Sequence, residues 1–116
     1  MKRRISRKGV DLQQWNETVE GDDGVTWHFV FVNDDVPEML DGVHATWRVI
    51  SGGRQIDAGE YSVDEQIDPE TAVEDIKDEL LNDIDHGAFQ TKNPSGMIEI
   101  KFDVPPTKSQ RSIRRR

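Results

Sequence analysis

The chain has 116 residues, of which 33% are charged and 34% are hydrophobic, and its net charge is -8. It contains no cysteine, which excludes disulfides, thiolate zinc sites and cysteine nucleophiles. No apolar run is long enough to span a membrane and no apolar stretch follows the N-terminal charges, so we expect a protein of the cytoplasm or of a virion, without a secretory signal.

The charges are separated along the chain. Residues 1–8 and residues 105–116 each contain five cations and no acid. The other five of the 15 cations and all 23 acids lie in residues 9–104, which therefore carry a charge of -18. We expect a basic N-terminal arm (1–10), one acidic domain (11–104) and a basic C-terminal arm (105–116). The candidate contact residues of the arms are Lys2, Arg3, Arg4, Arg7, Lys8, Lys108, Arg111, Arg114, Arg115 and Arg116.

Two strands are predicted at the start of the domain. Residues 11–20 (DLQQWNETVE) precede the turn-forming GDDG at 21–24, and VTWHFVFVN follows that turn. The second segment has apolar side chains at both parities, which is typical of a central strand buried on both faces. Its two faces carry Val25, Trp27, Phe29 and Phe31 on one side, and Val30 and Val32 on the other.

Residues 34–42 (DDVPEMLDG) are expected to form a connection, because Pro37 and Gly42 disfavour a strand. One helical turn at 37–40 is also compatible with this segment. Its apolar residues, Val36, Met39 and Leu40, allow two interpretations. They cap one end of the core, or they form a loop that binds a partner.

The segments 43–51 and 54–63 flank Gly52 and Gly53, which predicts a hairpin with a two-residue turn. Counting outward from the turn predicts four cross-strand pairs, Ser51–Arg54, Val49–Ile56, Arg48–Asp57 and Trp47–Ala58. Further from the turn, Tyr61 and Val63 have the wrong parity for the buried face. A bulge near Gly59 would correct this.

A helix is predicted over residues 68–87, with Asp68 as its cap, Pro69 in its first position and Gly87 at its end. An apolar stripe recurs at helical spacing and is expected to pack on the sheet: Val73, Ile76, Leu80, Leu81 and Ile84. The other face carries one cation, Lys77, among the acids Glu70, Glu74, Asp75, Asp78, Glu79, Asp83 and Asp85. This acidic face is either a solvated surface or an imitation of a row of phosphates.

A final strand is predicted at residues 97–104, where apolar and polar residues alternate before Pro105 and Pro106. Its inward residues are Ile98, Ile100, Phe102 and Val104, and its outward residues are Met97, Glu99, Lys101 and Asp103. The element order ββββαβ predicts an α+β fold, with one amphipathic helix packed on a mainly antiparallel sheet or small sandwich.

The sequence contains little that indicates a reaction. Glu99-x-Lys101, with Asp83 and Asp85 upstream, matches part of a metal-dependent nuclease pattern, but so short a match is weak evidence. His28, His44 and His86 lack the spacing of a metal site, and the three tryptophans are expected in the core rather than in a base-stacking platform. We therefore expect no enzyme, no metal or other cofactor, and no small-molecule substrate.

Three functions remain. The first is a non-enzymatic assembly protein, such as a small component of a phage or viral head, connector or tail, whose arms contact neighbouring subunits or another protein. The second is an acidic inhibitor or nucleic-acid mimic that binds a basic groove through the helix at 69–86. The third is nucleic-acid binding through the basic arms alone.

Overall fold

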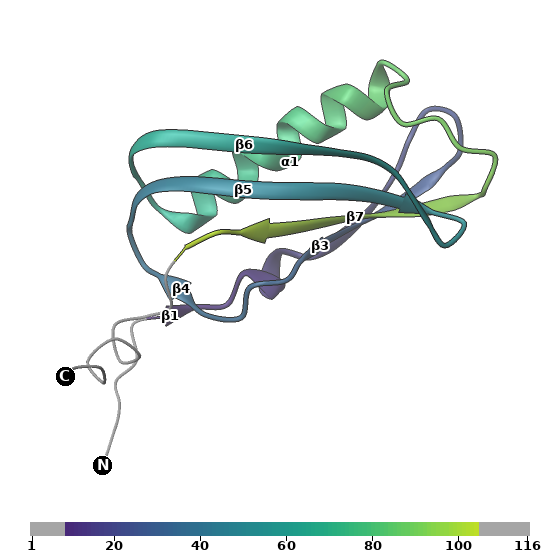
Figure 1. The fold of residues 1–116 in the computed structure, drawn as a ribbon. Coiled ribbons are helices and arrows are strands. Elements are labelled where there is room, and N and C mark those ends of the chain that lie inside the picture. The colour runs from purple at the N-terminus through teal and green to yellow at the C-terminus, as the bar shows by residue number, and fades with distance from the viewer. Residues whose placement is uncertain (1–8, 105–116) are drawn as a thin grey trace, which may run out of the picture.

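Figure 1 shows a computed structural model of the chain, which describes residues 9–104. Its main feature is a five-stranded sheet of order β2-β3-β7-β5-β6, with one helix lying across one face. The predicted α+β class is confirmed. The elements are β1 (Gly9–Val10), the 3-10 helix η1 (Leu12–Trp15), β2 (Glu17–Glu20), β3 (Thr26–Phe31), β4 (Val36–Pro37), β5 (Leu40–Ser51), β6 (Arg54–Ile67), α1 (Pro69–Asp85) and β7 (Ser95–Phe102).

The sheet is mixed rather than wholly antiparallel. Strands β2 and β3 form an antiparallel hairpin, and so do β5 and β6. After α1 the chain returns to place β7 between these two hairpins, where it runs parallel to β3 and antiparallel to β5. A parallel pair needs a long connection of this kind. Strand β3 is interior, as predicted, but only one of its faces is covered, because His28 is exposed and Val30 is half-buried.

The segment at 11–20 is only partly a strand. The side chain of Asp11 accepts a hydrogen bond from the backbone N–H of Gln13 (2.9 Å) and so caps η1, which takes the place of the first half of the predicted strand. Leu12 is fully buried in this short helix. The strand β2 starts only at Glu17.

Two short strands extend the fold beyond the expected limits. Val36 and Pro37 form β4, although Pro37 was expected to prevent a strand there, and no helical turn forms at 37–40. Proline is tolerated in β4 because β1 is its only partner strand among residues 9–104. Gly9 and Val10, which were expected in the N-terminal arm, belong to β1 and are paired with β4.

The β5–β6 hairpin has the predicted turn but a different register. Gly52 and Gly53 have φ angles of 62° and 76°, as a tight hairpin turn requires, and the pair Ser51–Arg54 is confirmed. Beyond it, Ile56 is an extra residue on β6, and the other three predicted pairs are wrong. The observed pairs are Ile50–Gln55, Val49–Asp57, Arg48–Ala58 and Trp47–Gly59.

The bulge therefore lies closer to the turn than Gly59. The position of this bulge is explained by Trp47, whose ring covers Gly59. A Cβ atom at residue 59 would lie 2.1 Å from Cζ2 of that ring. Gly59 is thus required for close packing, and the shift at Ile56 brings it opposite Trp47.

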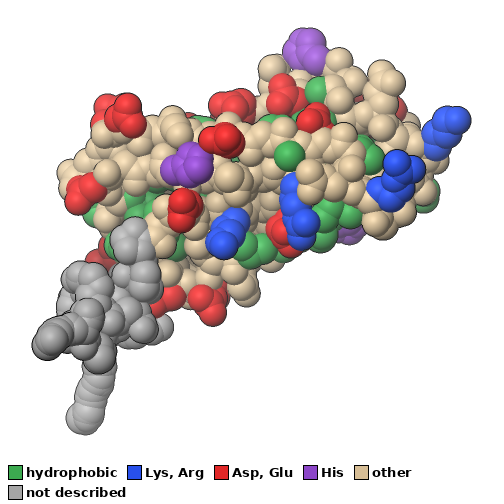
Figure 2. All heavy atoms as spheres, in the orientation of Figure 1, with side chains coloured by type: hydrophobic (Ala, Val, Ile, Leu, Met, Phe, Trp, Pro, Cys, Tyr) green, Lys and Arg blue, Asp and Glu red, His purple; other side chains and the backbone are tan. Residues whose placement is uncertain are grey.

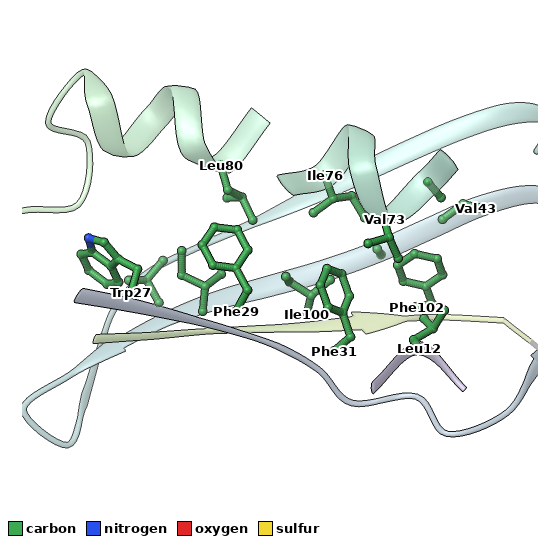
Figure 3. Packing of buried hydrophobic residues seen from close by; sticks show 14 of the residues in the cluster. Leu12, Trp27, Phe29, Phe31, Val43, Val73, Ile76, Leu80, Ile100 and Phe102 are labelled. Atoms are coloured by element: carbon green, nitrogen blue, oxygen red, sulfur yellow. The ribbon is translucent and has the colours of Figure 1, made fainter. Parts of the chain in front are cut away.

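The helix α1 has the predicted ends. The carboxylate of Asp68 accepts hydrogen bonds from the backbone N–H (3.4 Å) and the hydroxyl (2.6 Å) of Thr71, and Gly87 beyond the helix has a φ of 73°. Figure 3 shows its apolar stripe packed on aromatic and aliphatic side chains of β3 and β7. Leu81 is only half-buried, whereas Ala72, which was not predicted to be on the stripe, is fully buried.

The two ends of the described chain lie at one end of the sheet, which we call the arm end. Here β1 pairs with β4, the first residue of β5 pairs with Ile67 at the end of β6, and Phe102 at the end of β7 pairs with Ala45. Figure 1 shows β1 and the end of β7 on this side of the molecule. Between residues 9 and 104 no helix is long and apolar enough to cross a membrane.

Candidate functional site

The acidic helix face is a continuous surface of α1. It consists of Glu70, Glu74, Asp75, Asp78, Glu79, Asp83 and Asp85, of which only Asp83 is half-buried and the others are exposed. Residues four positions apart on a helix are neighbours on its surface, separated by about 6 Å along the axis. The acids at 70, 74 and 78, and those at 75, 79 and 83, therefore form two rows.

Lys77 does not belong to that exposed face. Its side chain is only 10% exposed and forms ion pairs with Glu17 of β2 and with Glu74, whose Oε2 lies 3.6 Å from the ammonium nitrogen. The expectation that Lys77 stands among the exposed acids is wrong. The long aliphatic stem packs inward and brings the ammonium group to the edge of the sheet. Every charged side chain that α1 exposes is therefore acidic.

The predicted partner loop is divided by burial. Val36 and Leu40 are 0% and 3% exposed and belong to the core, so the capping interpretation is correct for both. Met39 between them is 50% exposed. Of the three, Met39 alone offers a substantial apolar surface to a partner.

Met39 borders a shallow depression of about 410 Å³ at the arm end. We call it the arm-end depression, and it is lined by Met39, Glu65, Gln66, Ile67, Asp68, Thr71 and Asp75. Its rim carries three carboxylates, and none of its lining residues is a cation. Its lining combines two apolar side chains, those of Met39 and Ile67, with these three carboxylates.

Hydrogen bonds fix two of the three carboxylates. The hydroxyl of Thr71 donates to Asp68 and holds the pKa of Asp68 below its usual value. The hydroxyl of Tyr61 donates to Asp75 (3.1 Å). Burial, and then this hydrogen bond, raises the pKa of Tyr61 to about 12. The lowered pKa of Asp68 favours the ionised form of this carboxyl group.

The face of the sheet opposite α1 carries charges of both signs. Arg48 and Glu99 form an ion pair (2.7 Å) in a second depression, of about 510 Å³, which Lys101 and Glu60 also line. In Figure 2, acidic side chains predominate toward the arm end of the visible surface and basic side chains toward the opposite end, and the two kinds meet near the centre. This face is electrostatically mixed, unlike the arm-end depression.

His44 lies on this mixed face between two acids. Its Nε2 is 2.8 Å from Glu60, and its Nδ1 is 3.7 Å from Asp103. The hydrogen bond to Glu60 is the main cause that raises the pKa of His44 above 6.5. Protonation of His44 therefore strengthens both contacts.

The residues of the nuclease pattern are not brought together. Glu99 and Lys101 lie on the face of β7 away from α1, whereas Asp83 and Asp85 belong to α1 itself. Within residues 9–104, no group of three or more His, Cys, Asp or Glu side chains could hold a metal ion. The three histidines contact different groups, namely Thr18 for His28, Glu60 and Asp103 for His44, and the carbonyl of Asn82 for His86.

The tryptophans pack within the domain. Trp27 is buried, and Trp15 and Trp47 are half-buried. The rings of Trp27 and Trp47 both meet Phe89 edge to face, at centroid distances of 6.1 and 5.6 Å. Phe89 borders a third depression, of about 650 Å³, which Asp23 and Lys92 also line.

Sequence reasoning did not find the arm-end depression. The predicted hairpin strand ended at Val63, whereas β6 continues to Ile67 and places Glu65 and Ile67 beside α1. Val63 and Ile67 are four residues apart and therefore lie on the same face of an extended strand. This spacing was the signal in the sequence that the strand continues beyond Val63. The arm residues, Lys2 to Lys8 and Lys108 to Arg116, lie outside the described part of the chain.

No protein family, curated protein or solved structure matches this sequence.

Proposed function

We propose that this protein is a non-enzymatic assembly protein, whose basic arms bind an acidic surface of a neighbouring copy. A repeated subunit of a phage or viral particle is the setting that we propose for it. The observation that carries the proposal is the burial of the Lys77 side chain. Because this cation is buried, every charged side chain that α1 exposes is a carboxylate. The chain thus holds a purely acidic surface together with ten cations in its two terminal segments.

The charges are sufficient for association only when they act together. A single exposed ion pair contributes about 0–1 kcal/mol. Five cations in one arm, facing a domain of charge -18, act as a set and also speed the encounter of two copies. Salt screens exposed charges over a Debye length of about 8 Å at physiological ionic strength, so the association is salt-sensitive.

Sedimentation velocity of the full chain in low salt (about 0.05 M) and in high salt (about 0.5 M) tests the proposal. We expect oligomers in low salt and monomers in high salt. A variant with all ten arm cations replaced by glutamine should be monomeric in both. As a control, Arg54→Gln with Lys92→Gln removes two exposed cations of the domain and should still associate. A wild-type chain that stays monomeric in low salt would contradict self-assembly.

An acidic inhibitor or mimic is a second candidate, and the same observation favours it. Two rows of carboxylates without an exposed cation on α1 would suit a basic groove on another protein. Charge reversal at Glu74 and Asp78 should then abolish binding to such a partner, and unchanged binding would exclude the idea. Nucleic-acid binding through the arms predicts instead a gel shift of duplex DNA that disappears steeply with salt.

A further inference from the structure

Each arm contains an isoleucine surrounded by arginines. The C-terminal arm reads Arg111-Ser112-Ile113-Arg114, and the N-terminal arm has Arg4-Ile5-Ser6-Arg7. In the sequence, each isoleucine has one arginine directly beside it and a second arginine two residues away. A surface that recognises such a segment needs apolar side chains together with carboxylates.

The arm-end depression has this combination. Its apolar lining residues are Met39, which is 50% exposed, and the half-buried Ile67. Its rim contains Glu65, Asp68 and Asp75. Its volume of about 410 Å³ exceeds what one isoleucine side chain needs, so parts of the flanking residues fit as well.

The other depressions fit a basic arm less well. The depression on the mixed face includes Arg48 and Lys101, which repel an incoming cation. The third includes Lys92. Among the three, the arm-end depression alone is lined by acids without a cation, so charge complementarity selects it.

Chain length favours the C-terminal arm. Ile113 follows Val104 by nine residues, a reach of about 30 Å when extended, whereas Ile5 precedes Gly9 by four residues, a reach of about 13 Å. The C-terminal arm is therefore suited to reach a second molecule.

We propose that the arm-end depression binds residues 111–114 of the C-terminal arm of a neighbouring copy. Ile113 packs on Met39 and Ile67, and the arginines at 111 and 114 face the carboxylates of the rim. This inference rests on the proposed assembly function and names its docking surface. Apolar packing at Met39 gives it a component that salt does not screen, in addition to the ion pairs.

Photo-crosslinking of the full chain tests the location directly. A benzoylphenylalanine at position 113 is placed in the full-length protein, and copies labelled with 14N and 15N are mixed in low salt before irradiation. We expect adducts between the two isotopic forms, on peptides that contain Met39 or residues 65–75. Adducts within a single copy, or on peptides from β3 and β7, would overturn the proposal.

A matched pair of substitutions tests the energetics. Met39 and Ile56, at 50% and 39% exposure, are the exposed large hydrophobic residues of the described chain. Met39→Ser should weaken self-association by about five-fold, as expected when roughly half of a methionine side chain is no longer buried. Ile56→Ser should leave it unchanged. Glu65→Gln removes a carboxylate that lines the depression, and it should weaken self-association more than Asp78→Asn, which removes a carboxylate of α1 outside the depression. Circular dichroism confirms that each variant is folded.

The outcomes separate the docking site from the assembly itself. If the wild-type chain associates while Met39→Ser and Ile56→Ser behave alike, the docking site is wrong and the assembly function stands. If the wild-type chain does not associate in low salt, the assembly function is wrong and the docking site falls with it.

Discussion

Replacement of Lys77 tests how the acidic helix face is produced. The side chain of Lys77 is 10% exposed, whereas its partners Glu17 and Glu74 are 44% and 55% exposed. The aliphatic stem thus lies in the core while the ammonium group reaches carboxylates that remain in contact with water. We predict that the stem stabilises the fold more than the charge does.

The magnitudes follow from these exposures. Lys77→Ala removes three methylenes, and at about 0.8 kcal/mol for each the expected loss is about 2.4 kcal/mol. Lys77→Met retains most of the apolar volume and removes the cost of burying an ammonium group. It loses ion pairs worth about 1 kcal/mol or less, because both glutamates stay solvated. We therefore expect Lys77→Met to lie within about 1 kcal/mol of the wild type.

Urea unfolding followed by tryptophan fluorescence measures both variants, with moderate salt present to limit repulsion within the acidic domain. Lys92→Met is the control, since it makes the same change of charge at an exposed loop position. The midpoint should fall for Lys77→Ala and stay nearly constant for Lys77→Met, with equal slopes. An equal loss for both variants would refute the reasoning, because it would assign the stability to the ion pairs.

Three further predictions concern packing and titration. Gly96→Ala should cost about 1–3 kcal/mol in thermal unfolding, because a Cβ atom there would lie 2.3 Å from the buried ring of Trp27. Tyr61 is the only tyrosine of the chain, and its tyrosinate absorbance should rise with a midpoint near 12. Asp75→Asn should move that midpoint only part of the way to 10.0, because burial is the larger cause of the raised pKa. The stability that the raised pKa of Tyr61 contributes is present below pH 10 and is lost as the pH rises through about 12. The raised pKa of His44 stabilises the fold below pH 6.5, and this contribution is lost as the pH rises through the raised pKa. In urea unfolding, His44→Gln should therefore be less stable than the wild type near about pH 5 and equally stable near about pH 9.

The parts of the fold that local signals specify could be predicted from the sequence. The helix at 69–85 has its cap at Asp68, its stop at Gly87 and an apolar stripe between them, and all three signals act within a few residues. The turn at Gly52 and Gly53 is equally local. Neither depends on which distant segments pack against it.

Features that depend on distant partners could not be predicted in the same way. The parallel pairing of β7 with β3 joins residues that are 69 positions apart, such as Thr26 and Ser95, and the alternation of residues 97–104 does not identify a neighbour. The bulge at Ile56 is set by the close approach of Trp47 to Gly59. Lys77 stands four residues after Val73 and three before Leu80, so helical spacing places it on the apolar stripe, but its partner Glu17 of β2 belongs to a distant segment.

The candidate site also has one part that local signals predict and one part that contacts between distant segments determine. The acidic helix face follows from helical spacing and was predicted almost residue by residue. The arm-end depression unites Met39, the end of β6 and the first turns of α1, which meet only because Leu40 pairs with Ile67. Met39, an apolar residue in an acidic loop, indicated a contact surface in the sequence. The residues that surround Met39 could be identified only from the folded structure.

The positions of donor and acceptor also predict how many copies associate. The C-terminal arm starts beyond Val104 at the arm end, and the depression that we propose as its receptor lies at the same end. Two copies that meet arm end to arm end can exchange their C-terminal arms around a two-fold axis, which occupies both depressions and closes the assembly. The mass measured by light scattering should then reach that of two chains and stop rising with concentration. A mass that keeps increasing with concentration would contradict this closure.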